Sequence, residues 1–141
     1  MKLFKDIINK NKLNKKQVTI GIIDWYPDMM QYIYAHEEMK QLFIAEGLKA
    51  VICHQENIEI RDGNLFTQGE KIDILFRLFL LGDIKGDKGE IRRILELYHL
   101  DNLIIINGIH TDLYSNKGNF AYLSDLEYQY MFNEEEKQVI N

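Results

Sequence analysis

An aspartate and an arginine stand within one of the most apolar runs of the chain. Asp73 and Arg77 lie in IDILFRLFLL, residues 72–81, which has the composition of a buried strand. Their i, i+4 spacing places both side chains on one face of a strand, too far apart for direct pairing. A buried guanidinium requires a carboxylate or a ligand, so Arg77 is either half of a structural ion pair or a site for a substrate carboxylate or phosphate.

Other polar side chains follow the runs that resemble strands. Ligands of open α/β sheets bind at the carboxyl ends of the strands, which selects Asp24, His54, Asp83 and residues 107–117. The residues after Asp24 contain no G-x-G-x-x-G motif, and Lys117 does not stand in a G-x-x-x-x-G-K-[ST] loop. Neither phosphate-binding motif is therefore present, and residues 107–117 are interpreted as a loop that leads into a helix.

The sequence gives little support to metal or thiol chemistry. The four histidines lack the H-x-x-x-H and H-E-x-x-H spacings, and GDIKGDKGE, residues 82–90, lacks the ligand spacing of a calcium loop. Cys53, the only cysteine, lies in an apolar run and is expected to be a small buried hydrophobe. Asp24 after the first apolar run also suggests a flavodoxin-like or response-regulator-like domain, although such receivers use a cluster of acids.

The remaining pattern alternates between the periods of strands and helices. Four runs are rich in β-branched residues and are expected to be buried strands: residues 18–24, 49–54, 72–81 and 102–108. Helical spacing is found at residues 28–46, 90–100 and 119–131. Asp62-Gly63 predicts a β-hairpin at residues 57–68. The predicted fold class is α/β: a Rossmann-like, three-layer arrangement with a mostly parallel sheet of about four strands, flanking helices and an added hairpin.

The bulk composition is that of an ordinary globular chain. With 141 residues and 46% hydrophobic residues, the chain is expected to form a core without disulfides or metals. The net charge of −5 and the pI of about 5.4 argue against nucleic acid or an anionic membrane as the main partner. No run is long enough to span a bilayer and no signal peptide is evident, so a cytoplasmic protein is expected.

Three stretches resemble one family in their order and spacing. They are VTIGIIDW, KAVICHQENIEIRDGNLFTQGEKIDILFRLFLL and IINGIHTDLYSNKGNFAYLSD, within residues 18–125. They are similar to the amino-terminal part of circularly permuted, glutathionylspermidine-synthase-like ATP-grasp proteins, which are carboxylate–amine ligases and their relatives. The matching positions are Asp24-Trp25, Asp73, Arg77, Asn116-Lys117, Phe120-Ala121 and Leu123-Ser124-Asp125. Asp112 stands where the family often has a lysine, and Phe76 replaces a common tyrosine.

The resemblance implies a pre-ATP-grasp domain, a Rossmann-like unit that precedes the ATP-grasp fold. It implies that Arg77 and Asp73 contact a substrate, and that Lys117 and Asn116 contact the nucleotide. ATP and Mg²⁺ are the implied cofactors of the parent enzyme, in which an acyl-phosphate forms and is attacked by an amine. This chain alone is expected to hold neither cofactor and to contain no catalytic or metal-ligating residue.

Two hypotheses about function follow. In the first, the chain is the amino-terminal fragment of an ATP-grasp carboxylate–amine ligase-like protein and is inactive alone. It then comprises a basic amino-terminal helix or arm (residues 1–16), a pre-ATP-grasp-like domain (17–125) and the helical start of a carboxyl-terminal part (126–141). In the second, it is a stand-alone α/β module that binds a protein or a small ligand without catalysis. The expected partners are the rest of the ligase or a self-associated copy, and small amine and carboxylate substrates.

Overall fold

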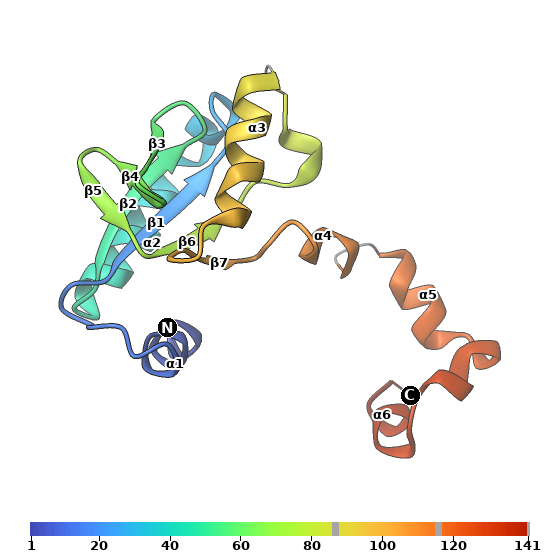
Figure 1. Cartoon of the computed structure of the whole chain (residues 1–141). Helices are drawn as coiled ribbons and strands as arrows, with labels where there is room; N and C mark the ends of the chain where they lie inside the picture. The colour runs from blue at the N-terminus through green and yellow to red at the C-terminus, as the bar shows by residue number, and fades with distance from the viewer. Residues whose placement is uncertain (86–87, 115–116, 141) are drawn as a thin grey trace. The chain divides into compact units, whose positions relative to one another are not determined.

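The chain forms two compact units, Met1–Gly108 and Ile109–Asn141. This computed structural model describes residues 1–85, 88–114 and 117–140 (Figure 1). All strands of the described residues belong to the first unit, and the described residues of the second unit form helices and turns. Each unit is therefore considered by itself.

A four-stranded, all-parallel sheet is the centre of the first unit (Figure 1). Its strands run in the order β2 (Lys49–His54), β1 (Thr19–Asp24), β6 (Ile74–Arg77) and β7 (Ile104–Ile106). Parallel neighbours require crossover connections, which here contain α2 (Ile33–Ala45) between β1 and β2 and α3 (Lys88–Glu96) between β6 and β7. The predicted α/β class with a parallel sheet and flanking helices is confirmed.

A smaller antiparallel sheet is inserted after β2. It consists of β3 (Ile58–Arg61), β4 (Asn64–Thr67) and β5 (Glu70–Ile72). Asp62 and Gly63 connect β3 and β4 with φ angles of 49° and 70°, as a type I′ turn requires. The hairpin predicted at residues 57–68 is confirmed, and β5 extends it to three strands.

The apolar run of residues 72–81 is divided between the two sheets and does not form the single strand that its composition predicts. Asp73 stands between β5 and β6. Its main-chain N–H donates to the Thr19 carbonyl, and its carbonyl accepts from the Ile104 N–H, both at 3.0 Å. The chain thus passes from the small sheet to the large one at Asp73, and the strand of the large sheet ends at Arg77.

Both faces of the large sheet are buried, which produces three layers. On one face, Phe4 of α1 (Lys2–Lys10) packs edge-on against Phe43 of α2 and Phe76 of β6, with ring centroids 4.7 and 5.4 Å away. On the other face, Ile23 and Leu75 lie in one cluster with side chains from α3, the 3₁₀ helix η3 (Leu97–His99) and the small sheet. The amino-terminal helix is therefore attached to the core through its apolar face.

Two helix ends have the residues and the backbone geometry that helix caps require. α2 ends at Ala45, and Gly47 follows with a φ of 76°, the left-handed conformation expected at this position. In the second unit, the main-chain N–H of Asn133 donates to Glu136 and the N–H of Glu136 donates to Asn133, a capping box with both bonds at 2.9 Å. The helices of that unit are α4 (Thr111–Tyr114), α5 (Gly118–Ser124), η4 (Leu126–Met131) and α6 (Glu134–Ile140).

The helices are short compared with the thickness of a bilayer. Spanning its hydrocarbon core takes roughly 20 apolar residues. Within the described ranges, no helix has both the length and the apolar composition needed to cross a membrane.

Gly21 in β1 is required by a close approach between the sheets. A Cβ atom on Gly21 would lie 3.0 Å from Cγ2 of Ile72 and 3.2 Å from Cδ1 of Leu75. We expect Gly21→Ala to lower the free energy of unfolding by about 1–3 kcal/mol because the buried, β-branched Ile72 has little freedom to move. Urea unfolding followed by Trp25 fluorescence measures this. Gly82→Ala is the matched control, since nothing lies within 4 Å of its Cβ position; equal effects of the two substitutions would contradict the prediction.

Candidate functional site

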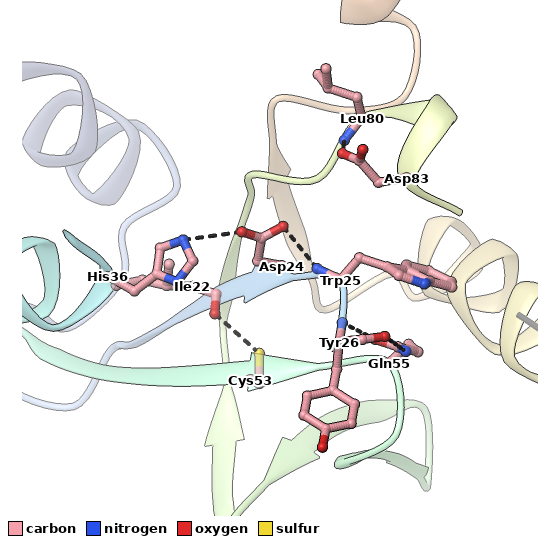
Figure 2. A network of polar contacts seen from close by, with 9 residues as sticks. All are labelled: Ile22, Asp24, Trp25, Tyr26, His36, Cys53, Gln55, Leu80 and Asp83. Atoms are coloured by element: carbon pink, nitrogen blue, oxygen red, sulfur yellow. Dashed lines mark hydrogen bonds and ion pairs between the residues drawn. The ribbon is translucent and has the colours of Figure 1, made fainter. Parts of the chain in front are cut away.

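Asp24 ends the central strand β1 with a carboxylate that is held from two sides. Oδ1 accepts a hydrogen bond from the main-chain N–H of Trp25 at 2.8 Å, and Oδ2 lies 3.0 Å from Nε2 of His36 in α2 (Figure 2). Both side chains of this pair are largely buried, with exposed fractions of 15% for Asp24 and 6% for His36. The carboxylate orientation is therefore fixed by elements on both sides of the strand end.

The buried surroundings of His36 indicate which nitrogen carries its proton. Nδ1 of His36 has no hydrogen-bond partner among the described residues and is shielded from solvent. A proton on this atom would be a buried donor without an acceptor, which costs free energy. The arrangement therefore favours the tautomer with its proton on Nε2, where Asp24 accepts it.

The protein environment disfavours the charge of Asp24. Burial raises the pKa of this carboxyl above its usual 3.8, and the negative charge of Asp83 adds to the increase. The hydrogen bond from the Trp25 N–H and the neighbouring His36 act in the opposite direction without cancelling the effect of burial. Asp24 is thus a carboxyl group with a raised pKa at the end of a central strand. Groups with shifted pKa values are typical of functional sites.

A hollow of about 590 Å³ opens beside Asp24 at the carboxyl edge of the large sheet. It lies between the end of β1, the 3₁₀ helix η1 (Asp28–Tyr32) and the segment after β6 that includes η2 (Leu81–Asp83). The residues that line it are Asp24, Trp25, Asp28, Met29, Gln31, Tyr32, Leu78, Leu80, Asp83 and Lys85. Its polar lining is dominated by carboxylates, because Lys85 is the only cation among these residues.

Two of the acidic side chains in this lining already have partners. Asp28 lies 3.4 Å from Nζ of Lys85, an exposed ion pair that joins η1 to the segment after η2. Asp83 accepts a hydrogen bond from the main-chain N–H of Leu80 at 2.7 Å (Figure 2). The Asp28–Lys85 pair connects the two walls of the hollow, and the Asp83 bond is local to the wall formed by η2.

The chain beyond Asp24 is held by a buried glutamine. Gln55 accepts from the main-chain N–H of Tyr26 at 2.9 Å and donates to the Tyr26 carbonyl at 2.7 Å (Figure 2). The Tyr26 ring lies over His54, with centroids 4.9 Å apart. Burial lowers the pKa of His54, and Glu56 partly opposes this. Gln55 therefore fixes the backbone that leaves β1, beside the strand end of β2.

Trp25 lies under the hollow as part of the core. Its side chain is 1% exposed and packs edge-on against Phe79, with ring centroids 5.4 Å apart. Its indole Nε1 has no hydrogen-bond partner among the described residues. The buried Trp25 ring thus forms the base of the hollow at this end of the sheet.

Arg77 ends β6 next to Asp24 and is directed into the protein. Its guanidinium donates to the main-chain carbonyls of Asn107, Phe79 and Gly108, and its exposed fraction is 4%. These bonds connect the end of β6 to the residues that follow β7. The structure thus gives Arg77 a structural task, and its proposed contact with a substrate stays a prediction.

The other predicted site residues lie elsewhere. Asp73 is at the amino edge of the sheet, where its carboxylate accepts from the Thr19 N–H at 3.0 Å and lies 3.3 Å from Nζ of Lys71. Lys117 is exposed and precedes α5 in the second unit, and Asn116 lies outside the described residues. Asp73 therefore precedes β6 and Arg77 ends it, so the two lie at opposite edges of the sheet, and their binding roles remain predictions.

The sequence pattern did not single out His36 as a partner of Asp24. His36 occupies a position on the apolar face of the predicted helix at residues 28–46, and this polar residue in an apolar stripe was the available signal. No group of three or more His, Cys, Asp or Glu side chains that could hold a metal occurs within the described parts of the chain. A carboxylate such as Asp24 can accept hydrogen bonds from ligand N–H or O–H groups and can act as a general base.

We expect Asp24→Asn to remove the fall in the free energy of unfolding that wild type undergoes as the pH rises through the folded pKa of Asp24. The pKa of Asp24 is raised in the folded protein, so the folded state holds a proton more tightly than the unfolded state, and stability falls as the pH rises above 3.8 through the folded pKa. Asparagine does not ionise, so the variant does not undergo this decrease in stability. Its free energy of unfolding should therefore rise most relative to that of wild type above that pH range. Urea unfolding between pH 4 and pH 7 measures the difference, using roughly the range in which carboxyl groups titrate.

Asp24→Ala serves as the contrasting variant. It leaves the Trp25 N–H and Nε2 of His36 without their acceptor, which is expected to cost about 1–3 kcal/mol. A free energy of unfolding that changes equally with pH in wild type and in Asp24→Asn would contradict the raised pKa of Asp24.

Removal of the Arg77 guanidinium should destabilise the end of the sheet. Arg77→Met leaves the carbonyls of Phe79, Asn107 and Gly108 without these donors, at an expected cost of about 2–4 kcal/mol. Urea unfolding and amide hydrogen exchange at residues 104–108 measure the effect. Arg92→Met on the exposed side of α3 is the control, with an expected change within about 0.5 kcal/mol. Equal stability of the two variants would show that these hydrogen bonds contribute little.

Neither the models of known protein families nor the curated proteins give a match. The resemblance to ATP-grasp proteins therefore rests on the sequence stretches that carry it.

Proposed function

We propose that the chain is the amino-terminal, pre-ATP-grasp-like domain of a carboxylate–amine ligase-like protein, and that its hollow receives the amine substrate. The observation that carries this proposal is the position of Asp24. Its carboxylate is largely buried, is oriented by His36 and the Trp25 N–H, and lines a hollow at the carboxyl edge of a parallel sheet. This edge is where open α/β sheets bind ligands.

The charge in the hollow favours a cationic ligand. Asp24, Asp28 and Asp83 line it against a single lysine, which is already paired with Asp28. A carboxylate accepts hydrogen bonds and a protonated amine only donates them, so the two groups are complementary. Because burial disfavours the Asp24 charge, an adjacent cation relieves an existing cost as well as adding an attraction.

The fold is consistent with the matched sequence positions. Ile23 and Arg77 are register partners on β1 and β6, so the matched Asp24 and Arg77 end neighbouring strands. Arg77 holds the carbonyls of Asn107 and Gly108, at the start of the matched stretch that contains Lys117. In this proposal Arg77 holds the residues that follow β7. Lys117 contacts the nucleotide in the parent enzyme, where ATP and Mg²⁺ would activate the carboxylate.

A second candidate is a stand-alone interaction module without catalysis. The second unit exposes large apolar side chains such as Leu126 and Tyr130, at 81% and 79%. Exposed apolar surface of this kind marks protein interfaces. This candidate needs neither the amine nor the nucleotide.

The proposal predicts that the full chain binds a short alkyl diamine in the hollow. Titration followed by ¹H–¹⁵N NMR should shift the amide signals of Trp25, Tyr32 and Asp83. Asp24→Asn should weaken binding by roughly tenfold, the effect expected for the loss of one charge-assisted contact. Asp6→Asn, on α1 and outside the hollow lining, is the matched control.

Further titrations separate the hypotheses. A diol of the same length tests for the ammonium charge and should cause no shifts at these residues. Shifts that are equal for diol and diamine, or absent at millimolar diamine, would refute the amine site. ATP with Mg²⁺ is titrated separately and should cause no shifts, because this chain alone is expected to hold neither cofactor.

A further inference from the structure

The second unit has an apolar surface that it does not cover itself. Seven large apolar side chains in this unit have exposed fractions between 57% and 87%: Leu113, Tyr114, Tyr122, Leu126, Tyr130, Met131 and Val139. None of its residues with a described burial is buried. Helices as short as these gain their stability from packing an apolar face, so this unit requires a surface to dock on.

The charge of the second unit restricts what this surface can be. Residues 109–141 contain six carboxylates and two lysines, a formal net charge of −4. Apolar contacts with this unit therefore bring an acidic segment onto the docking surface. A basic surface is complementary to it, and an acidic one is repelled.

A basic surface of matching magnitude is present at the amino terminus of this chain. Residues 1–16 contain six lysines and one aspartate, a formal net charge of +5. We call the exposed Lys10, Lys12, Lys15 and Lys16 the lysine face. Lys5 pairs with Glu46 at 2.6 Å, whereas the ion pairs found among the described residues do not use Lys10, Lys12 or Lys16.

We infer that the second unit of one copy, through α4, α5, η4 and α6, docks on the lysine face of a second copy of this chain. A pocket of about 370 Å³ lies beside the lysine face; Leu13 and Val18 form its apolar part, and Lys49, Glu70, Lys71 and Asp73 are its charged lining residues. Two copies can exchange the contact reciprocally, which gives a closed dimer with twofold symmetry.

The place where the chain leaves the first unit is compatible with docking on a second copy. Residues 13–17 line the pocket at the amino edge of the large sheet, together with Thr19 and Asp73. The chain leaves this sheet at Gly108, beyond the carboxyl end of β7, where Arg77 holds it. The lysine face and the exit of the chain are thus at opposite edges of one sheet, and docking on a second copy does not require the segment to return along the strands.

The available side chains match the size of a stable interface. A standard interface buries roughly 800 Å² on each partner. A fully buried tyrosine contributes about 150–250 Å², so Tyr114, Tyr122 and Tyr130 with the four aliphatic side chains supply an area of this order. The inference rests on residues 1–16 and 109–141, so it is independent of amine binding in the hollow.

Sedimentation velocity of the full chain tests the inference. We expect a concentration-dependent dimer whose dissociation constant rises at least tenfold between about 50 mM and 500 mM NaCl, because salt screens the exposed charges. One variant carries Lys12→Glu, Lys15→Glu and Lys16→Glu, and a second carries Glu127→Lys, Glu134→Lys and Glu135→Lys, which leaves the capping box of Asn133 and Glu136 intact. Each variant alone should be monomeric, and an equimolar mixture should form a heterodimer, since the complementary charges are then restored between copies.

Lys88→Glu combined with Arg92→Glu on α3 is the control for a change of charge elsewhere and should dimerise as wild type does. A wild-type chain that stays monomeric at all concentrations, including by docking within one chain, overturns the inference. So does a dimer that either triple variant leaves intact, or a mixture of the two variants that remains monomeric. Amide signals around the hollow report separately on diamine binding, so failure of dimerisation is distinguishable from failure of the proposed function.

Discussion

The hydrogen bonds of Asp73 set the register on which the large sheet and its carboxyl edge depend. Its carboxylate and its main-chain N–H both bond to Thr19 at the start of β1, and its carbonyl accepts from Ile104. From this point β1 and β6 run in register to the pair Ile23 and Arg77. The residues that end the strands are thereby brought to one edge, because a shift of one residue would exchange the two faces of β6.

Two charged groups at that edge meet the cost of burial differently. Arg77 donates its N–H groups to main-chain carbonyls, so its hydrogen-bonding capacity serves the connection between β6 and the residues after β7. Asp24 also has two donors, yet its pKa stays raised, which means that its hydrogen bonds do not offset the lost hydration. A ligand has more to gain from Asp24 than from Arg77, since only Asp24 lines the hollow.

The parts of the structure that the sequence predicted are those governed by local rules. Apolar periodicity identified the parallel sheet, and the positive φ angles of Gly47, Asp62 and Gly63 follow from residue type. The division of residues 72–81 between two sheets depends on bonds from Asp73 to distant strands, which no local pattern contains. The partners of Arg77 are main-chain carbonyls and the acceptor of His36 is a tertiary neighbour, so neither was visible in the order of the side chains.

The net charge of −5 conceals an uneven distribution that bears on both proposals. With +5 in residues 1–16 and −4 in residues 109–141, residues 17–108 carry the remaining −6. The hollow lies within this acidic part, whose field attracts a protonated amine and repels free nucleotide phosphates. An amine and a nucleotide are therefore expected to use different surfaces of a parent ligase, which agrees with the separation in sequence between Asp24 and Lys117. The same uneven distribution makes the lysine face complementary to an acidic segment.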